Sequence, residues 1–85
     1  MWRFFELMPV MDESNIVSLG EGGTPLLRAS NLAKSLGLQN LYIKDEGLNP
    51  TGSFKSRGIS AAVSKAKELN QQAITMPTAG NAGGI

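Results

Sequence analysis

A strand–helix–strand pattern runs through the second half of this 85-residue chain. Residues 40–44 are rich in β-forming side chains and predict one short strand, and residues 73–76, stopped by Pro77, predict another. Between them, apolar residues recur at steps of three and four, the period of an amphipathic helix: Ile59, Ala62, Val63, Ala66 and Leu69. The short connections predict a βαβ unit, with parallel strands and a right-handed crossover, and hence an α/β fold built on an open, mostly parallel sheet with flanking helices.

Two glycine-rich loops follow the two predicted strands, at residues 46–54 and 77–84. Both loops leave the carboxyl ends of their strands, which lie at the ligand-binding edge of a parallel sheet. Both also precede helix N-termini, whose free N–H groups attract anions. We therefore expect Lys55, after the first loop, and Asn81, in the second, to lie close together at one ligand.

The first half of the chain predicts smaller elements. An apolar arm at residues 2–10 needs a larger surface to pack on, and the glycine-rich residues 18–25 predict a turn. A short helix is expected from Ser30, with Gly37 ending it. Within the 46–54 loop, Asn49-Pro50-Thr51-Gly52 fits a type I turn, and Asp45 and Glu46 are expected to be a solvated strand end.

Composition excludes several classes of function. The chain has no Cys and no His, so it can form no disulfide, zinc ribbon or imidazole base, and no metal site is expected. With a net charge of +1 and no run of basic residues, the sequence does not predict binding to nucleic acid or to acidic membranes. No signal peptide or membrane span is recognisable, and we expect a cytoplasmic location.

Lys55 is the most unusual titratable residue of the pattern. A cation in the first turn of a helix opposes the helix dipole, and Arg57 adds a second positive charge close by. The ordinary interpretation is a pair of solvated side chains. The alternative is an amine kept able to lose its proton, as reaction with an aldehyde requires. A P-loop is excluded, because Ser53 stands where that motif needs Lys.

The sequence around Lys55, Leu48-Asn-Pro-Thr-Gly-Ser-Phe-Lys-Ser-Arg-Gly58, resembles the cofactor-lysine motif of the fold type II pyridoxal-phosphate enzymes. Two further segments, Gly20-Glu-Gly-Gly-Thr-Pro-Leu-Leu27 and Lys44-Asp-Glu-Gly47, make it similar to the threonine synthase branch of that family. The resemblance covers nearly all of residues 17–84.

The resemblance implies a role for each matching residue. Lys55 matches the lysine that forms a Schiff base with pyridoxal 5′-phosphate and then carries protons, and Asn81 matches the asparagine that contacts the 3′-oxygen of the cofactor. The matching loop in the family holds the substrate carboxylate, and its residues here are Thr78, Ala79, Gly80, Asn81 and Ala82. Ser53 is expected to be structural.

The implied reaction converts O-phospho-L-homoserine and water to L-threonine and phosphate. Ala82 stands where many relatives carry Thr or His, so a related dehydratase or β-eliminating lyase remains an alternative. A non-catalytic remnant that binds a partner through sheet edges is another, although Lys55 and Asn81 are intact. A parallel sheet of two strands has exposed edges and both of its faces uncovered. Residues 1–85 are therefore expected to be an incomplete N-terminal portion of a catalytic region. We expect this portion to be inactive alone and the full-length protein to be homo-oligomeric.

Overall fold

The computed structural model describes residues 1–85, and its longest element is the helix α2, Lys55–Glu68. The strands β1 (Leu26–Arg28) and β2 (Tyr42–Lys44) flank a short helix α1 (Ser30–Ser35). Three 3₁₀ turns lie at Trp2–Leu7, Glu13–Asn15 and Glu46–Leu48. The α/β character and the helices expected near residues 30 and 55–69 are thus confirmed.

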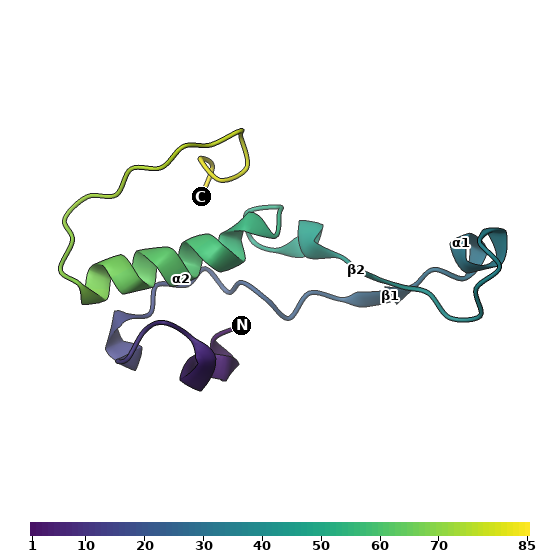
Figure 1. The fold of residues 1–85 in the computed structure, drawn as a ribbon, viewed down its shortest axis with the longest axis horizontal. Coiled ribbons are helices and arrows are strands. Elements are labelled where there is room, and N and C mark those ends of the chain that lie inside the picture. Colours follow the sequence, from purple (N-terminus) through teal and green to yellow (C-terminus); the bar gives the residue numbers. More distant parts are fainter.

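The sheet has two antiparallel strands, with Leu27 opposite Ile43 at its centre. Together with α1 they form a hairpin arm, residues 26–44, that projects from the rest of the molecule (Figure 1). Gly37, in the left-handed region with φ of 69°, ends α1 as expected. The expected partner of residues 40–44 was a different segment, residues 73–76.

The strand predicted at residues 73–76 is not formed. These residues run as irregular chain without a ladder partner, so the predicted parallel pairing is absent and the observed sheet is antiparallel. The physical reason is that β-forming side chains make a strand only beside a strand with free N–H and C=O groups. Residues 73–76 have no such neighbour, because they run beside α2, whereas β2 lies in the projecting hairpin arm and pairs with β1.

The buried face of α2 consists of three serines spaced four residues apart, Ser56, Ser60 and Ser64. The hydroxyls of Ser60 and Ser64 form hydrogen bonds with the backbone of Val17, which lies outside any strand. Val17 N–H donates to Ser64 Oγ at 2.8 Å, and Val17 C=O accepts from Ser60 Oγ at 2.6 Å. Trp2 Nε1 also donates to Ser60 Oγ, at 3.0 Å, which docks the apolar N-terminal arm onto the helix.

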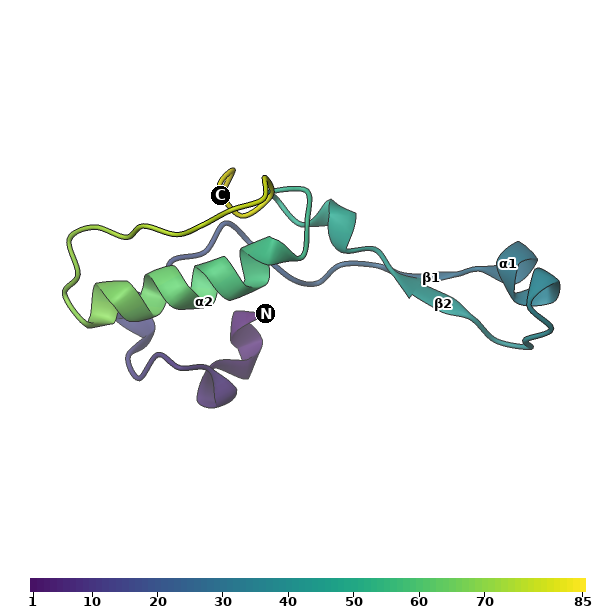
Figure 2. The same ribbon diagram turned by 45° about the horizontal axis from the view of Figure 1, so that its top comes forward.

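The chain after α2 turns back along the helix. Asn70 takes a left-handed backbone conformation, with φ of 58°, and residues 70–77 then run beside α2 towards its start, as Figures 1 and 2 both show. The 14 residues of α2 span about 21 Å, and eight residues of extended chain span roughly 26 Å. The lengths match, so residues 77–82 return to the first turn of the helix.

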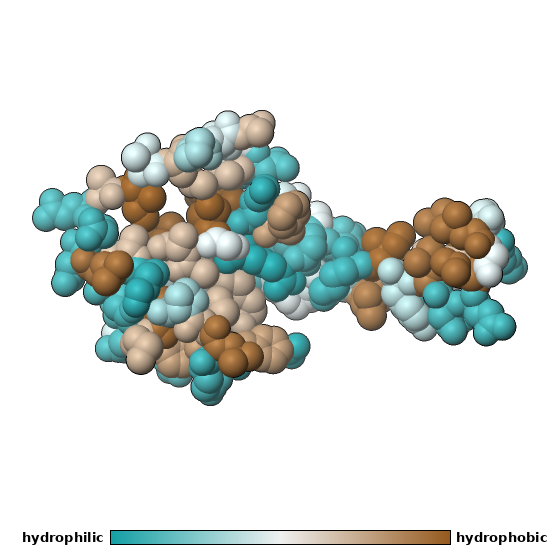
Figure 3. Space-filling model, viewed as in Figure 1, coloured by the Kyte–Doolittle hydropathy of each residue, from teal (hydrophilic) through white to brown (hydrophobic).

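The molecule is elongated and has almost no core. It measures 52 × 30 × 16 Å with a radius of gyration of 16.3 Å, against about 12 Å for a compact domain of this length. Only two hydrophobic residues are buried, Val10 and Ala33. Figure 3 shows hydrophobic side chains gathered openly at the end of the hairpin arm that carries α1. None of the helices has both the length and the apolar character needed to cross a membrane.

Candidate functional site

The site is built at the first turn of α2, where a tight turn delivers Lys55. Gly52 N–H donates to Asn49 C=O at 2.8 Å and Gly52 takes a φ of 78°, so the turn expected at residues 49–52 is present. Ser53, which is buried, accepts a hydrogen bond from Lys55 N–H at 3.3 Å and thereby occupies one free amide of the helix start. This contact supports the structural role expected of Ser53.

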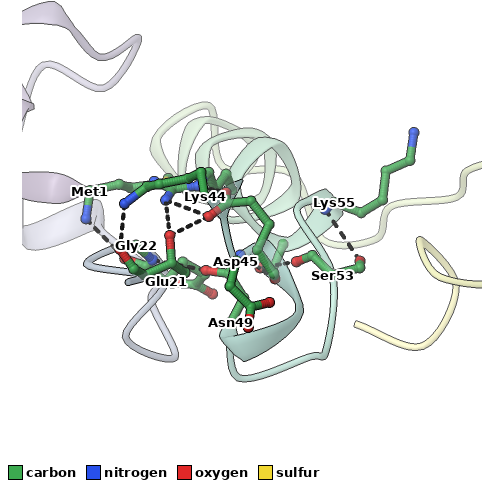
Figure 4. Close-up of polar contacts among 12 residues, drawn as sticks. Met1, Glu21, Gly22, Lys44, Asp45, Asn49, Ser53 and Lys55 are labelled. Carbon is green, nitrogen blue, oxygen red and sulfur yellow. Dashed lines mark hydrogen bonds and ion pairs between the residues drawn. The ribbon is translucent and has the colours of Figure 1, made fainter. Parts of the chain in front are cut away.

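The side chain of Lys55 is exposed and has no hydrogen bond or ion pair. Its Nζ lies 5.0 Å from the centroid of the Phe54 ring, a cation–π distance. Figure 4 shows it pointing away from the polar cluster that contains Glu21, Lys44 and Asn49. The amine is therefore available to a ligand.

A shallow pocket of about 280 Å³ joins Lys55 to the second glycine-rich loop. The loop residues that line it are Pro77, Thr78, Ala79, Gly80, Asn81 and Ala82. The structure thus brings every candidate residue named from the sequence to one place. It does so through the return of residues 70–77 along α2, and without the parallel sheet from which the proximity was expected.

The 77–82 loop is held by its own threonine. Thr78 Oγ1 accepts hydrogen bonds from Gly80 N–H at 3.0 Å and from Gly83 N–H at 2.8 Å. Gly80 has a φ of 140°, and a Cβ at this position would meet no atom within 4 Å, so the space beside it is open. No hydrogen bond engages the side-chain amide of Asn81, which stays free to bind a ligand oxygen.

A clasp of four residues lies behind the first turn of α2: Thr24, Glu46, Asn49 and Arg57. Arg57 Nε pairs with Glu46 Oε1, and Arg57 Nη2 donates to Glu46 Oε2 at 3.0 Å. Thr24 Oγ1 also donates to Glu46, and Asn49 Nδ2 donates to Glu46 C=O at 3.0 Å. Thr24 and Asn49 are buried.

The clasp corrects two expectations about charge. Glu46 is not a solvated strand end, because its side chain is only 24% exposed and accepts hydrogen bonds from Arg57 and Thr24. These hydrogen bonds lower its pKa from 4.5 to about 2. The Glu46 carboxylate in turn raises the pKa of Arg57 above its usual value. The positive charge of Arg57 is thus largely compensated by Glu46, and Arg57 serves as a structural partner rather than a free cation beside Lys55.

The clasp and the serine stripe were not predicted from the sequence. The clasp residues are scattered from residue 24 to residue 57, and only a folded chain brings them together. The sequence offered one indication of the clasp. Thr24 and Glu46 belong to the segments Gly20–Leu27 and Lys44–Gly47, which matched family motifs although no role could be assigned to either residue.

Known proteins match this chain over nearly its whole length. The family described as pyridoxal-phosphate dependent enzyme matches residues 17–84. The threonine synthase of Methanocaldococcus jannaschii is 54% identical over 81 residues, which are 95% of this chain and 20% of that protein. The threonine synthase of Methanosarcina acetivorans is 44% identical over 81 residues, with the same two shares.

A bacterial relative gives the same picture. The threonine synthase of Halalkalibacterium halodurans is 49% identical over 85 residues, which are 94% of this chain and 24% of that protein. The chain therefore spans between a fifth and a quarter of the length of these relatives.

Proposed function

Because the chain belongs to the family of pyridoxal-phosphate dependent enzymes, we propose that it is the N-terminal portion of a threonine-synthase-like lyase. The proposed reaction converts O-phospho-L-homoserine and water to L-threonine and phosphate. The identity of 44–54% to threonine synthases over nearly the whole chain supports this reaction over others of the family. The observation that carries the proposal is the unpartnered amine of Lys55 in one pocket with residues 77–82.

The residues of this pocket fit pyridoxal phosphate, the cofactor of the family. An accessible primary amine can bond to an aldehyde carbon, and an unengaged amide side chain can donate to a phenolic oxygen on the same ring. Open space beside Gly80 leaves room for an approaching ligand. When bound, the cofactor withdraws electrons so that protons can leave the carbon skeleton of an amino acid.

We assign the residues of this chain distinct roles. Lys55 Nζ bonds to the cofactor and moves protons to and from the substrate. Asn81 donates its side-chain amide to the ring oxygen of the cofactor. The substrate carboxylate is bound by the loop from Thr78 to Ala82, whose geometry is maintained by the two hydrogen bonds that Thr78 Oγ1 accepts. None of these roles requires a metal ligand.

We further propose that the longer enzyme has an open, mostly parallel sheet to which residues 73–76 contribute a strand. Ile74 and Met76 are exposed here and would be covered by such a sheet. Leu26, Leu27 and Ile43 on the hairpin arm are exposed as well. The homo-oligomeric state and the cytoplasmic location stay predictions from the sequence.

A chimera tests the proposed reaction. This chain would replace the matching 81 residues of the M. jannaschii threonine synthase, and release of threonine and phosphate from O-phosphohomoserine would be measured. We expect both products in equal amounts and their loss in Lys55→Ala. Cofactor binding with 2-oxo acid and ammonia as the main products would favour the dehydratase alternative. An inactive chimera that binds no cofactor would favour the non-catalytic remnant.

A further inference from the structure

Lys55 and Arg57 lie on opposite sides of the first turn of α2. Successive residues of a helix are separated by about 100° around its axis, so residues two apart point about 200° apart. Lys55 faces the pocket with residues 77–82, and Arg57 faces the glycine-rich residues 20–25. Whatever holds Arg57 therefore sets the rotation of this turn and the direction of Lys55.

Arg57 is held from several directions at once. In addition to Glu46, it donates to Thr24 Oγ1 at 3.3 Å. Backbone also approaches it closely, because a Cβ on Gly22, whose φ is 95°, would lie 3.1 Å from Arg57 Nη1. The guanidinium thus meets two oxygens of one carboxylate and a buried hydroxyl, with the backbone of Gly22 close by.

The same contacts tie α2 to the segments that precede it. Gly22 N–H donates to Asn49 Oδ1 at 3.0 Å, which connects residues 20–25 to the turn at 49–52. Lys44 Nζ donates to Thr24 C=O, so the end of β2 is tied to the same segment. A single exposed ion pair contributes little to a fold, but this one is about one quarter to one third exposed and sits in a network with two buried partners.

We propose that Glu46 and Arg57 are positioning residues that fix the rotation of the first turn of α2 and so direct Lys55 into the pocket with residues 77–82. The proposal rests on the proposed function, because it assumes that Lys55 receives the cofactor. It assigns Glu46 no contact with the cofactor or substrate. It differs from a purely stabilising role, because it predicts an effect at Lys55 that other lysines do not share.

The test measures where pyridoxal phosphate bonds to this chain when it stands in the chimera with the M. jannaschii enzyme. The chimera is incubated with the cofactor, reduced with borohydride and mapped by peptide mass spectrometry, with Lys34 on the exposed helix α1 as an internal reference. In the unchanged chain we expect a preference for Lys55 over Lys34. In Glu46→Gln that preference should fall roughly tenfold, as expected when a reacting group is slightly misplaced. Glu68→Gln, which removes the negative charge that pairs with Lys65 at the far end of α2, is the matched control and should leave the preference unchanged.

Two further measurements separate positioning from general loosening. Hydrogen exchange without cofactor should rise in residues 20–25 and 53–58 of Glu46→Gln but stay unchanged in residues 59–69. The swapped pair Glu46→Arg with Arg57→Glu should restore part of the preference for Lys55. A preference that survives Glu46→Gln, or that falls equally in Glu68→Gln, overturns the positioning role alone. An unchanged chain without preference for Lys55 overturns the proposed function, and the positioning role with it.

Discussion

At the scale of single residues, Lys55 and Asn81 differ in what they contribute. The Lys55 amine is the one group in the pocket able to form a covalent bond with an aldehyde, whereas the Asn81 amide can only donate and accept hydrogen bonds. Both were proposed from the sequence, because the residues around each resemble a family motif of consecutive positions. The polar residues behind them were not, because their partners are far apart in the chain.

Asn81→Ala should distinguish the hydrogen bond of Asn81 to the cofactor from the covalent bond of Lys55 to it. In the chimera with the M. jannaschii enzyme, this variant should still bond the cofactor to Lys55, because the amine is untouched. Turnover should fall, by roughly ten- to a thousandfold if the amide stabilises charge on the ring oxygen during the reaction. The measurement pairs borohydride trapping with phosphate release, and Asn40→Ala, in the hairpin arm, is the control. Loss of trapping in Asn81→Ala would contradict the assigned role.

At the scale of elements, helical periodicity located α2 but not its buried face. Ile59 and Val63, on the apolar stripe, are only half-buried and line an open groove of about 520 Å³ with Ile74 and Met76. The serines are buried instead, because the backbone of Val17 needs hydrogen-bond partners and hydroxyls supply them. A polar stripe of the same period leaves no trace in the spacing of apolar residues, so the serine face was not predictable from that spacing.

Ser60→Ala should weaken the docking of the N-terminal arm. The substitution removes the partner of Trp2 Nε1 and one of the two hydroxyls that donate to Val17 C=O, and a hydrogen bond of this kind typically contributes about 0.5–1.5 kcal/mol. Because Trp2 is the only tryptophan, its fluorescence during a urea titration reports the docking directly. Ser35→Ala, on the exposed side of α1, is the matched control. Equal midpoints for the two variants would show that the hydroxyl of Ser60 does not hold the arm.

The clasp also predicts a pH dependence. Hydrogen bonds from Arg57 and Thr24 depress the pKa of Glu46 to about 2 in the folded chain, against 4.5 ordinarily. An acidic group whose pKa is lowered by folding stabilises the folded state at any pH above its pKa in the unfolded chain. This contribution of Glu46 is therefore complete above about pH 4.5 and is lost as the pH falls through about 2. The carboxyl ¹³C resonance of Glu46 should titrate near 2, and in Arg57→Ala it should move towards 4.5. A midpoint near the ordinary value in the unchanged chain would mean that the pair does not form.

At the scale of the whole molecule, the structure explains why so little of the sheet could be predicted. A parallel sheet requires strands from distant parts of a chain, and this chain spans about a fifth of the length of its archaeal relatives. The βαβ interpretation correctly grouped the two loops at one pocket, but it paired residues 73–76 with residues 40–44, which instead form β2 of the antiparallel hairpin. With Val10 and Ala33 as the only buried hydrophobic residues, the chain also lacks the core that would rigidify a site.

The chain alone should therefore bind pyridoxal phosphate weakly and turn over no substrate. Catalysis needs groups held in place, and a molecule without a packed core cannot hold them for long. Calorimetry with the cofactor and a threonine assay on the purified chain measure the two quantities, with the chimera as the positive control. Threonine formation by the chain alone would show that the relatives' remaining length is dispensable.

Lys55 is proposed as the residue that bonds to the cofactor. Reduction of the cofactor-loaded chimera with borohydride, followed by peptide mapping, tests this assignment. We predict that the label is found on the peptide that contains Lys55 and is absent from Lys65 and Lys67, which lie about 15 and 18 Å further along α2. Label on any lysine other than Lys55, with Lys55 unmodified, would contradict the account.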